Sequence, residues 1–365
     1  MEKEQNEIDV SEDFFGLFWD YVKDDNITDI EYDGQFIWYT DSNGAIRKSG
    51  KEVKDSDIEL FTSKVANRAN KLFNRKETIL EADTDTLRIS ILHEEIAKSG
   101  RSICIRKTPP AVRIIPEEAV KNGYCTQEML SFLINCVKAR KTFVICGEPG
   151  AGKTECAKML STYIAEDEKV ITIEDSPEWR YKKINPGKMG VEIVVNEGFD
   201  YTQAIKASLR QNPKWLMLAE ARSVEVKSLI ECWSTGVSGF TTLHTNDVRN
   251  IPDRILDMMP TRIDADRLEN DVYRYVDVGI LISKKMIDGE RKRRIEQICY
   301  FVRDKKKNFI LPVALDGRMA LTGYNMEMIC SQFDPDVVPE VFPGIDIPGG
   351  DFGSALMVTD LNRRL

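Results

Sequence analysis

Histidine is scarce in this 365-residue chain, which has only two, and none of its eight cysteines stands in a C-x-x-C pair. Structural zinc sites take their ligands from these residue types at short spacing, so the sequence predicts none. Most of the cysteines fall in apolar helix or strand patterns, where a free thiol behaves as a small buried side chain. We therefore expect reduced cysteines, as in a cytosolic protein. They are Cys104, Cys125, Cys136, Cys146, Cys156, Cys232, Cys299 and Cys330.

Long apolar runs and an excess of basic residues are also missing. No run of about 18 apolar residues occurs, so no membrane-spanning helix is predicted. The first ten residues are acidic and polar, and they lack the apolar core of a signal peptide. These features favour a cytoplasmic location. The net charge of −9 argues against direct nucleic-acid binding over a broad surface, although it leaves room for a local basic patch.

The composition is that of a folded globular protein, with 42% apolar and 30% charged residues. The length suffices for two domains. Pro109-Pro110 and Pro116 interrupt the pattern of strands and helices, which predicts a linker between the two domains. The segment after the second domain is rich in glycine and proline, and its role is unknown. We expect an N-terminal domain at 1–108, a linker at 109–116, a second domain at 117–315 and a C-terminal extension at 316–365.

The N-terminal part predicts a small α/β domain. Its β-type runs are separated by Asp33-Gly34 and Asn43-Gly44, which are strong hairpin signals. A helix is expected at 11–22 behind the N-cap Ser11. A longer helix carries its apolar residues on one face: Ile58, Phe61, Val65, Ala69 and Leu72. The expected strands are 27–32, 35–39, 45–49, 87–92 and 102–106.

From residue 117 onward, strands alternate with helices, which implies a mostly parallel sheet. The nearly continuous apolar composition of 143–146 is typical of a strand covered on both faces. After about residue 277 the pattern returns to β. The expected strands are 142–146, 170–174, 215–219, 239–243, 278–283 and 294–302.

One stretch predicts a phosphate site. Residues 147–154 match G-x-x-x-x-G-K-[ST], a match that chance produces with a probability on the order of one per cent in such a chain. Glycines let backbone N–H groups surround phosphate oxygens. Lys153 would reach the β- and γ-phosphates of ATP, and Thr154 would offer its hydroxyl to Mg²⁺. The eight binding residues are Gly147, Glu148, Pro149, Gly150, Ala151, Gly152, Lys153 and Thr154.

Polar residues at strand ends complete the expected site. Glu220 follows the apolar strand at 215–219, where a P-loop NTPase needs an acid to orient or deprotonate water. The alternative is that Glu220 has no catalytic role and only marks the point where the strand leaves the core for solvent. His244 follows another apolar strand, so we expect it at the sheet edge where ligands bind. The alternative is a structural histidine without a role in ligand binding. We expect the other histidine, His93, to be a surface residue without a role.

Three further stretches resemble one family in order and spacing. Residues 171–178 (ITIEDSPE) resemble its acidic box, 209–222 (LRQNPKWLMLAEAR) its Walker B block, and 235–246 (TGVSGFTTLHTN) its histidine box. The family is that of the secretion-superfamily traffic ATPases. These are hexameric motors of type II and type IV secretion, of conjugation, and of type IV and Flp pili. The resemblance covers about residues 27–300.

The resemblance implies a sensor-like N-terminal α/β domain and a RecA-like P-loop NTPase domain that hydrolyses ATP with Mg²⁺. It implies a catalytic or metal-positioning role for Glu174, unless that residue only caps a helix, and a sensor role for His244. Arg88 and Arg106 would reach the nucleotide of a neighbouring subunit, with solvated surface charges as the alternative. The implied partners are other copies of the chain and inner-membrane platform proteins, with peripheral membrane association.

Some positions depart from the family pattern. Ala219 and Lys214 replace the usual glycine and aspartate of the Walker B block, and Val237 replaces a histidine, which puts histidine-dependent coupling in question. The tetracysteine motif of the type II branch is missing, which favours the type IV secretion, conjugation or Flp-pilus branch. Two alternatives remain: an ATP-gated assembly platform that does not hydrolyse, and a P-loop kinase. For the basic runs 291–294 and 305–307, a solvated hairpin is favoured over contact with anionic lipid or an acidic partner.

Overall fold

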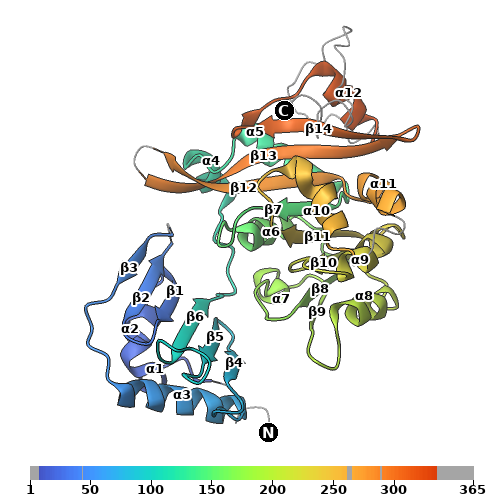
Figure 1. Ribbon diagram of the computed structural model, residues 1–365. Coiled ribbons are helices and arrows are strands. Elements are labelled where there is room, and N and C mark those ends of the chain that lie inside the picture. The colour runs from blue at the N-terminus through green and yellow to red at the C-terminus, as the bar shows by residue number, and fades with distance from the viewer. Residues whose placement is uncertain (1–7, 43, 261–264, 288–289, 335–365) are drawn as a thin grey trace. The chain divides into compact units, whose positions relative to one another are not determined.

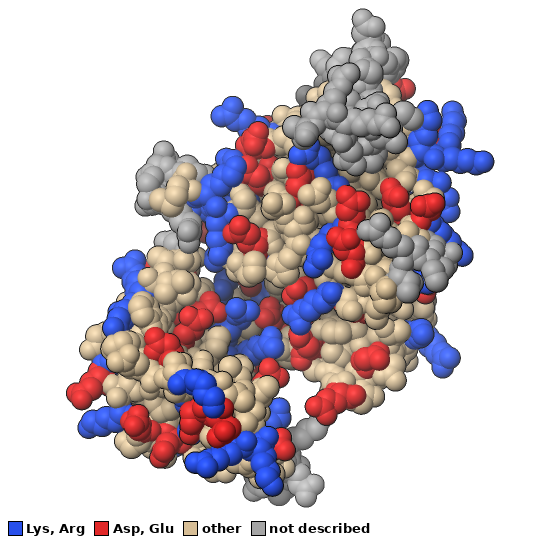
Figure 2. All heavy atoms as spheres, in the orientation of Figure 1, with Lys and Arg blue, Asp and Glu red and all other residues tan. Residues whose placement is uncertain are grey.

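The computed structural model describes residues 8–42, 44–260, 265–287 and 290–334 (Figure 1). The chain divides into two compact units. The first consists of Met1–Pro110 with Ser176–Glu178, and the second of Ala111–Asp175 with Trp179–Leu365. Figure 2 shows Lys and Arg side chains scattered among Asp and Glu on the visible face.

The first unit is a six-stranded antiparallel sheet with helices packed on one face. Along β5 (Leu87–Leu92), buried and half-buried residues alternate with the two-residue period of a strand. The buried side chains pack against Phe61 and Val65 of α3 (Asp55–Ala69). The remaining elements are α1 (Glu12–Phe15), η1 (Gly16–Phe18), α2 (Trp19–Val22), β1 (Ile27–Tyr32), β2 (Ile37–Asp41), β3 (Ile46–Lys48), β4 (Ile79–Asp83) and β6 (Ser102–Lys107).

Most expected elements of this unit are confirmed, but two helix predictions were wrong in detail. The helix at 11–22 is divided into three short segments, the first of which ends at Gly16 with a φ of +51°. Leu72 is 76% exposed rather than buried, because α3 ends at Asn70, whose φ is +50°. The hairpin expected at Asp33-Gly34 joins the antiparallel strands β1 and β2, and the Asp33 carboxylate accepts the backbone N–H groups of Gln35 and Phe36 in its turn. Asn43 lies outside the described residues.

The second unit is built on a nine-stranded sheet, in which the strands from β12 (Val278–Ile287) to the edge strand β9 (Gly190–Val194) run parallel. Three more strands extend it antiparallel beyond β12. The parallel sheet expected from the sequence is confirmed. In sheet order the strands are β15 (Arg318–Met319), β14 (Lys307–Leu315), β13 (Glu290–Asp304), β12 (Val278–Ile287), β7 (Phe143–Cys146), β11 (Ser238–Leu243), β10 (Trp215–Leu218), β8 (Val170–Glu174) and β9 (Gly190–Val194).

Helices cover both faces of this sheet (Figure 1). In β7, Phe143 and Ile145 belong to one apolar cluster, whereas Val144 and Cys146 belong to the other. One cluster includes α4 (Pro116–Lys121), α5 (Gln127–Lys138), α6 (Lys153–Ser161), α7 (Tyr181–Ile184) and α12 (Gly323–Cys330). The other includes α8 (Tyr201–Leu209), α9 (Glu225–Trp233), η2 (Val248–Asn250), α10 (Ile251–Asp257) and α11 (Ala265–Tyr275).

The C-terminal segment continues the second unit as far as it is described. Met326, Ile329 and Phe333 are buried in the cluster that contains α5 and α6. Residues 335–365 lie outside the described residues. All eight cysteines are free, and six of them are buried. Within the described ranges, no helix is both long and apolar enough to span a membrane.

Gly239 of β11 provides a test of the parallel sheet. A Cβ at this position would lie 2.1 Å from the carbonyl oxygen of Leu216 on β10 and 2.3 Å from Nε1 of Trp233. We expect Gly239→Ala to lower the free energy of unfolding by about 1–3 kcal/mol, the usual cost of overpacking. Denaturant melts measure this loss. The matched control is Gly198→Ala, because a Cβ there would lie 3.5 Å from Oδ1 of Asn196, an ordinary contact distance. Equal losses in both variants would contradict the packing.

Candidate nucleotide site

The phosphate loop connects the buried strand β7 to helix α6. Its three glycines have φ angles of +146°, +68° and +97° at Gly147, Gly150 and Gly152, which L side chains rarely adopt. A Cβ at Gly147 would also lie 2.4 Å from the carbonyl oxygen of Ile282 on β12. Thr154 stands in the first turn of α6, whose positive end faces the loop. The local fold therefore has the geometry that an anion site requires.

Lys153 is buried within this loop rather than exposed at its surface, with 7% of its surface accessible. Its Nζ donates to the carbonyl oxygens of Gly147 at 3.1 Å and Glu148 at 3.2 Å. The ammonium is thus held over the loop by the backbone that surrounds it. A Lys153 variant will therefore lose these loop contacts as well as a charge.

Glu220 and His244 come together at the carboxyl edge of the sheet, beside the loop. The Glu220 Oε1 lies 3.0 Å from Nε2 of His244, and the ring's Nδ1 lies 3.1 Å from the Gly147 carbonyl oxygen and 3.3 Å from Lys153 Nζ. Because a carboxylate can only accept, Nε2–H of His244 donates to Glu220. The histidine therefore joins the acid to the phosphate loop.

Backbone hydrogen bonds fix the segment that carries Glu220. Ala221 N–H donates to the Thr242 carbonyl oxygen at 2.9 Å, and the Thr242 hydroxyl donates to the Ala219 carbonyl oxygen at 2.7 Å. The pairing of β10 with β11 thus continues on both sides of Glu220. The acid is held on a rigid extension of the sheet, which suits a group that must be positioned accurately.

Arg222 connects the acid to the acidic box. Its Nη2 lies 3.0 Å from Oε2 of Glu220, and its Nη1 lies 3.0 Å from Oδ2 of Asp175. The hydrogen bond to Glu220 raises the pKa of Arg222 above its usual value. Sequence reasoning assigned no role to Arg222, although its position two residues after Glu220 in an irregular segment was a usable signal.

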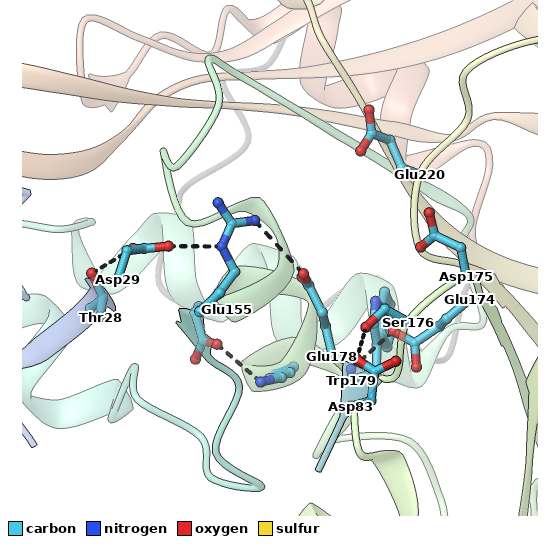
Figure 3. A network of polar contacts seen from close by, with 12 residues as sticks. Thr28, Asp29, Asp83, Glu155, Glu174, Asp175, Ser176, Glu178, Trp179 and Glu220 are labelled. Carbon is cyan, nitrogen blue, oxygen red and sulfur yellow. Dashed lines mark hydrogen bonds and ion pairs between the residues drawn. The ribbon is translucent and has the colours of Figure 1, made fainter. Parts of the chain in front are cut away.

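Glu174, at the end of β8, is only 2% exposed, and its Oε1 accepts the backbone N–H of Trp179 at 3.0 Å. Figure 3 shows Glu174 beside Trp179, with Asp175 and Glu220 following it along the same side of the view. The carboxylate therefore supports the turn after β8. Its neighbour Asp175 is the one whose carboxylate pairs with Arg222.

In the first unit, Arg88 and Arg106 stand directly opposite each other on β5 and β6. The neighbours of Arg88 in the strand, Leu87 and Ile89, are buried, so Arg88 projects from the other face. Arg106 Nε donates to Oδ1 of Asp29 at 2.9 Å, while Oδ2 of Asp29 accepts from the Thr28 hydroxyl at 2.8 Å (Figure 3). The two guanidinium groups thus share one face of the sheet.

Two other sequence predictions were wrong, one in each unit. His93 is 8% exposed rather than at the surface, since its ring packs against Phe73 and its Nδ1 accepts the Glu95 N–H at 3.0 Å. The basic run 291–294 is not a fully solvated hairpin, because Arg293 and Arg294 are half-buried. The other basic run, 305–307, is exposed as expected.

Of the positions that depart from the family pattern, Val237 packs against an apolar cluster of the second unit, and Lys214 is exposed before β10. Ala219 packs against the other cluster. Oxygen atoms, the ligands that Mg²⁺ prefers, lie beside the loop on Thr154, in the first turn of α6, and on Glu220. Among the described residues, no group of three His, Cys, Asp or Glu side chains could by itself hold a metal ion.

Comparison with known proteins places this geometry in a family. The model of the type II/IV secretion system protein family matches residues 75–288, more than half of the chain. The chain belongs to this family. The motif resemblance and the α/β fold class expected from the sequence are therefore confirmed, and membership of the type II/IV secretion family implies nucleotide binding.

Individual relatives are distant. An uncharacterized protein of Bacillus anthracis is 28% identical over 74% of this chain and 62% of its own length. A putative conjugal transfer protein of Mycobacterium tuberculosis is 23% identical over 60% of this chain and 65% of its own length. The chain thus spans somewhat less than two thirds of these relatives. The crystal structure of the ATPase DotB of Yersinia pseudotuberculosis shares the fold, with a TM-score of 0.60 at 14% identity over 86% of this chain and 89% of that one.

Lys153→Ala should abolish ATP binding, because it removes the cation at the centre of the loop. Binding of a fluorescent ATP analogue measures the loss, and thermal melts show whether the fold survives the lost loop contacts. Lys206→Ala is the matched control, since it removes one exposed lysine from α8. If the folded Lys153 variant binds ATP like the native protein, the phosphate-site assignment is wrong.

Proposed function

We propose that this protein is an ATP-hydrolysing motor of a type IV secretion, conjugation or Flp-type pilus machine. The observation that carries the proposal is the chain of contacts from the phosphate loop through His244 to Glu220, with steps of 3.1 Å and 3.0 Å. It joins a phosphate site to an acid that can act on water. Family membership supports a secretion function, and the name of the Mycobacterium relative supports conjugation.

In this proposal, Lys153 and the backbone N–H groups of the loop bind the β- and γ-phosphates. The Thr154 hydroxyl would hold Mg²⁺, which when bound neutralises part of the phosphate charge. Positioning and electrostatic stabilisation supply most of the catalysis in phosphoryl transfer. A rigid loop between β7 and α6 meets that requirement.

Glu220 orients the attacking water and accepts its proton. The water oxygen forms a bond to the γ-phosphorus while the bond from that phosphorus to the β,γ-bridging oxygen breaks, which leaves ADP and phosphate. His244 donates from Nε2–H to Glu220, and its Nδ1 can accept from Lys153 Nζ at 3.3 Å, so the position of the acid depends on the conformation of the loop. Glu174 would position the metal or the water by holding the turn at the end of β8.

A second candidate is an ATP-gated assembly platform that does not hydrolyse. Both oxygens of Glu220 already accept, one from His244 and one from Arg222, and Val237 replaces the family's histidine. A base held in this way could sense nucleotide without turning it over. Steady-state phosphate release from the purified protein separates the two candidates, because only the motor releases phosphate continuously.

We further propose that the protein works as a ring, most simply a hexamer, at the cytoplasmic face of a membrane-embedded platform. Arg88 and Arg106 would complete the site of a neighbouring subunit. A planar, permanently charged guanidinium suits γ-phosphate recognition. The placement of both arginines on one face of one sheet supports a joint role.

Glu220→Gln should retain ATP binding and lose hydrolysis by roughly two to four orders of magnitude, the scale of general-base and electrostatic effects. Phosphate release and nucleotide binding are measured on the same preparation. Glu197→Gln, an exposed carboxylate in the loop after β9, is the control for the lost charge. Undiminished hydrolysis in Glu220→Gln would mean that another acid, such as Glu174, acts on the water.

Mixing two inactive variants tests the ring. Arg88→Ala should bind ATP and hydrolyse it poorly, because an arginine supplied to phosphoryl transfer is worth about three to five decades in rate. Mixed with Lys153→Ala, it should regain activity, since some intact loops would then face an intact Arg88 of a neighbour.

The control mixture combines Lys153→Ala with Glu220→Gln. Each of these substitutions damages the site in which a subunit binds its own ATP. No interface in that mixture is complete, so it should stay inactive. If Arg88→Ala and Lys153→Ala form mixed oligomers without any recovery, Arg88 does not act between subunits.

A further inference from the structure

The hairpin of β12 and β13 runs past the phosphate loop. The last residue of β7, Cys146, pairs with Leu281, and β12 continues for six more residues to Ile287. The first of these, Ile282, has its carbonyl oxygen 2.4 Å from the Cβ position of Gly147. The hairpin therefore extends beyond the edge of the sheet on the side where the loop lies.

Two cations of this hairpin face the loop. Lys284 and Arg293 are directly opposite each other on β12 and β13. Lys284 Nζ lies 3.5 Å from the Pro149 carbonyl oxygen and would lie 3.2 Å from a Cβ at Gly150. The Arg293 Cδ would lie 3.6 Å from a Cβ at Gly152. Both side chains thus adjoin glycines of the loop.

The opposite face of the hairpin is fixed by a second network. Glu296, which is 4% exposed, accepts from the Ser283 hydroxyl at 3.0 Å, from Arg294 Nε at 2.7 Å, and from Lys285 Nζ. Burial works to raise the pKa of Glu296, but these hydrogen bonds hold it at about 2. Successive strand residues point to opposite faces, so this network directs Lys284 and Arg293 toward the loop.

We propose that Lys284 and Arg293 are nucleotide-binding residues that contact the phosphate chain of ATP within their own subunit. The inference rests on the proposed function, because it assumes that the loop holds a nucleoside triphosphate. Together with Lys153 they place three positive charges around the loop. Lysine acts on phosphate as a point charge, and arginine can donate two parallel hydrogen bonds to it. The affinity that such contacts add depends on the number of phosphates in the nucleotide and not on its base.

Nucleotide binding by neutral variants tests this proposal. Lys284→Met and Arg293→Met keep the length of the side chain and remove its charge. Each should weaken ATP binding about tenfold, the equivalent of one hydrogen bond to a charged group. ADP should lose less and AMP least, because fewer phosphates remain to be contacted. Fluorescent analogues of the three nucleotides measure the affinities at two salt concentrations, and Lys284→Arg should retain most of the ATP affinity.

Lys307→Met is the matched control, since it removes the same charge from an exposed position at the start of β14 in the same sheet. It should bind all three nucleotides like the native protein. Thermal melts accompany each variant, and Lys284→Gln replaces Lys284→Met if methionine lowers the Tm.

The outcomes separate this inference from the proposed function. Native ATP affinity in Lys284→Met and Arg293→Met, together with lost binding in Lys153→Ala, overturns the inference alone. Equal losses for ATP, ADP and AMP also overturn it, because the hairpin would then only support the loop. If the native protein binds no ATP, the proposed function fails, and the inference fails with it.

Discussion

Much of the second unit depends on the close approach of two backbones, at Gly147 and at Ile282. Any side chain at residue 147 would overlap the carbonyl oxygen of β12, so the loop can turn at this point only with glycine. The same contact brings the β12–β13 hairpin beside the loop. The phosphate loop therefore lies between that hairpin and His244, whose ring contacts the Gly147 carbonyl. Each neighbour of the loop limits the conformations open to it.

The location of the candidate site residues could be predicted from the sequence where they are adjacent in the chain or follow apolar strands. The glycines of the loop, Lys153, Glu220 and His244 are of this kind, because parallel strands bring their carboxyl ends to one edge. The contacts among them could not be derived, since a distance between strand ends depends on register. Arg222 is an example: its position two residues after Glu220 was visible in the sequence, but its contacts arise only when β8 and β10 place Asp175 and Glu220 on either side of it.

The fold shows the same division. Strands such as β1, β5 and β8 have the bounds that their local pattern indicates. By contrast, β9 and β14 were missed, because β9 is a short edge strand with exposed residues and β14 has an irregular alternation. His93 was misplaced since its burial comes from Phe73, twenty residues earlier in the chain. What a residue packs against is set by tertiary structure, which a local pattern does not contain.

The opposition of Arg88 and Arg106 has a thermodynamic consequence for the first unit. Like charges directly across a ladder destabilise a sheet, and the carboxylates of Asp29 and Glu178 offset part of this repulsion through Arg106, at 2.9 Å and 3.9 Å. An anion placed between the two guanidinium groups would remove the rest. Folding of the unit and capture of an anion are then linked equilibria. The first unit would gain stability from polyanions in solution, because they would reduce the repulsion that remains between its two arginines.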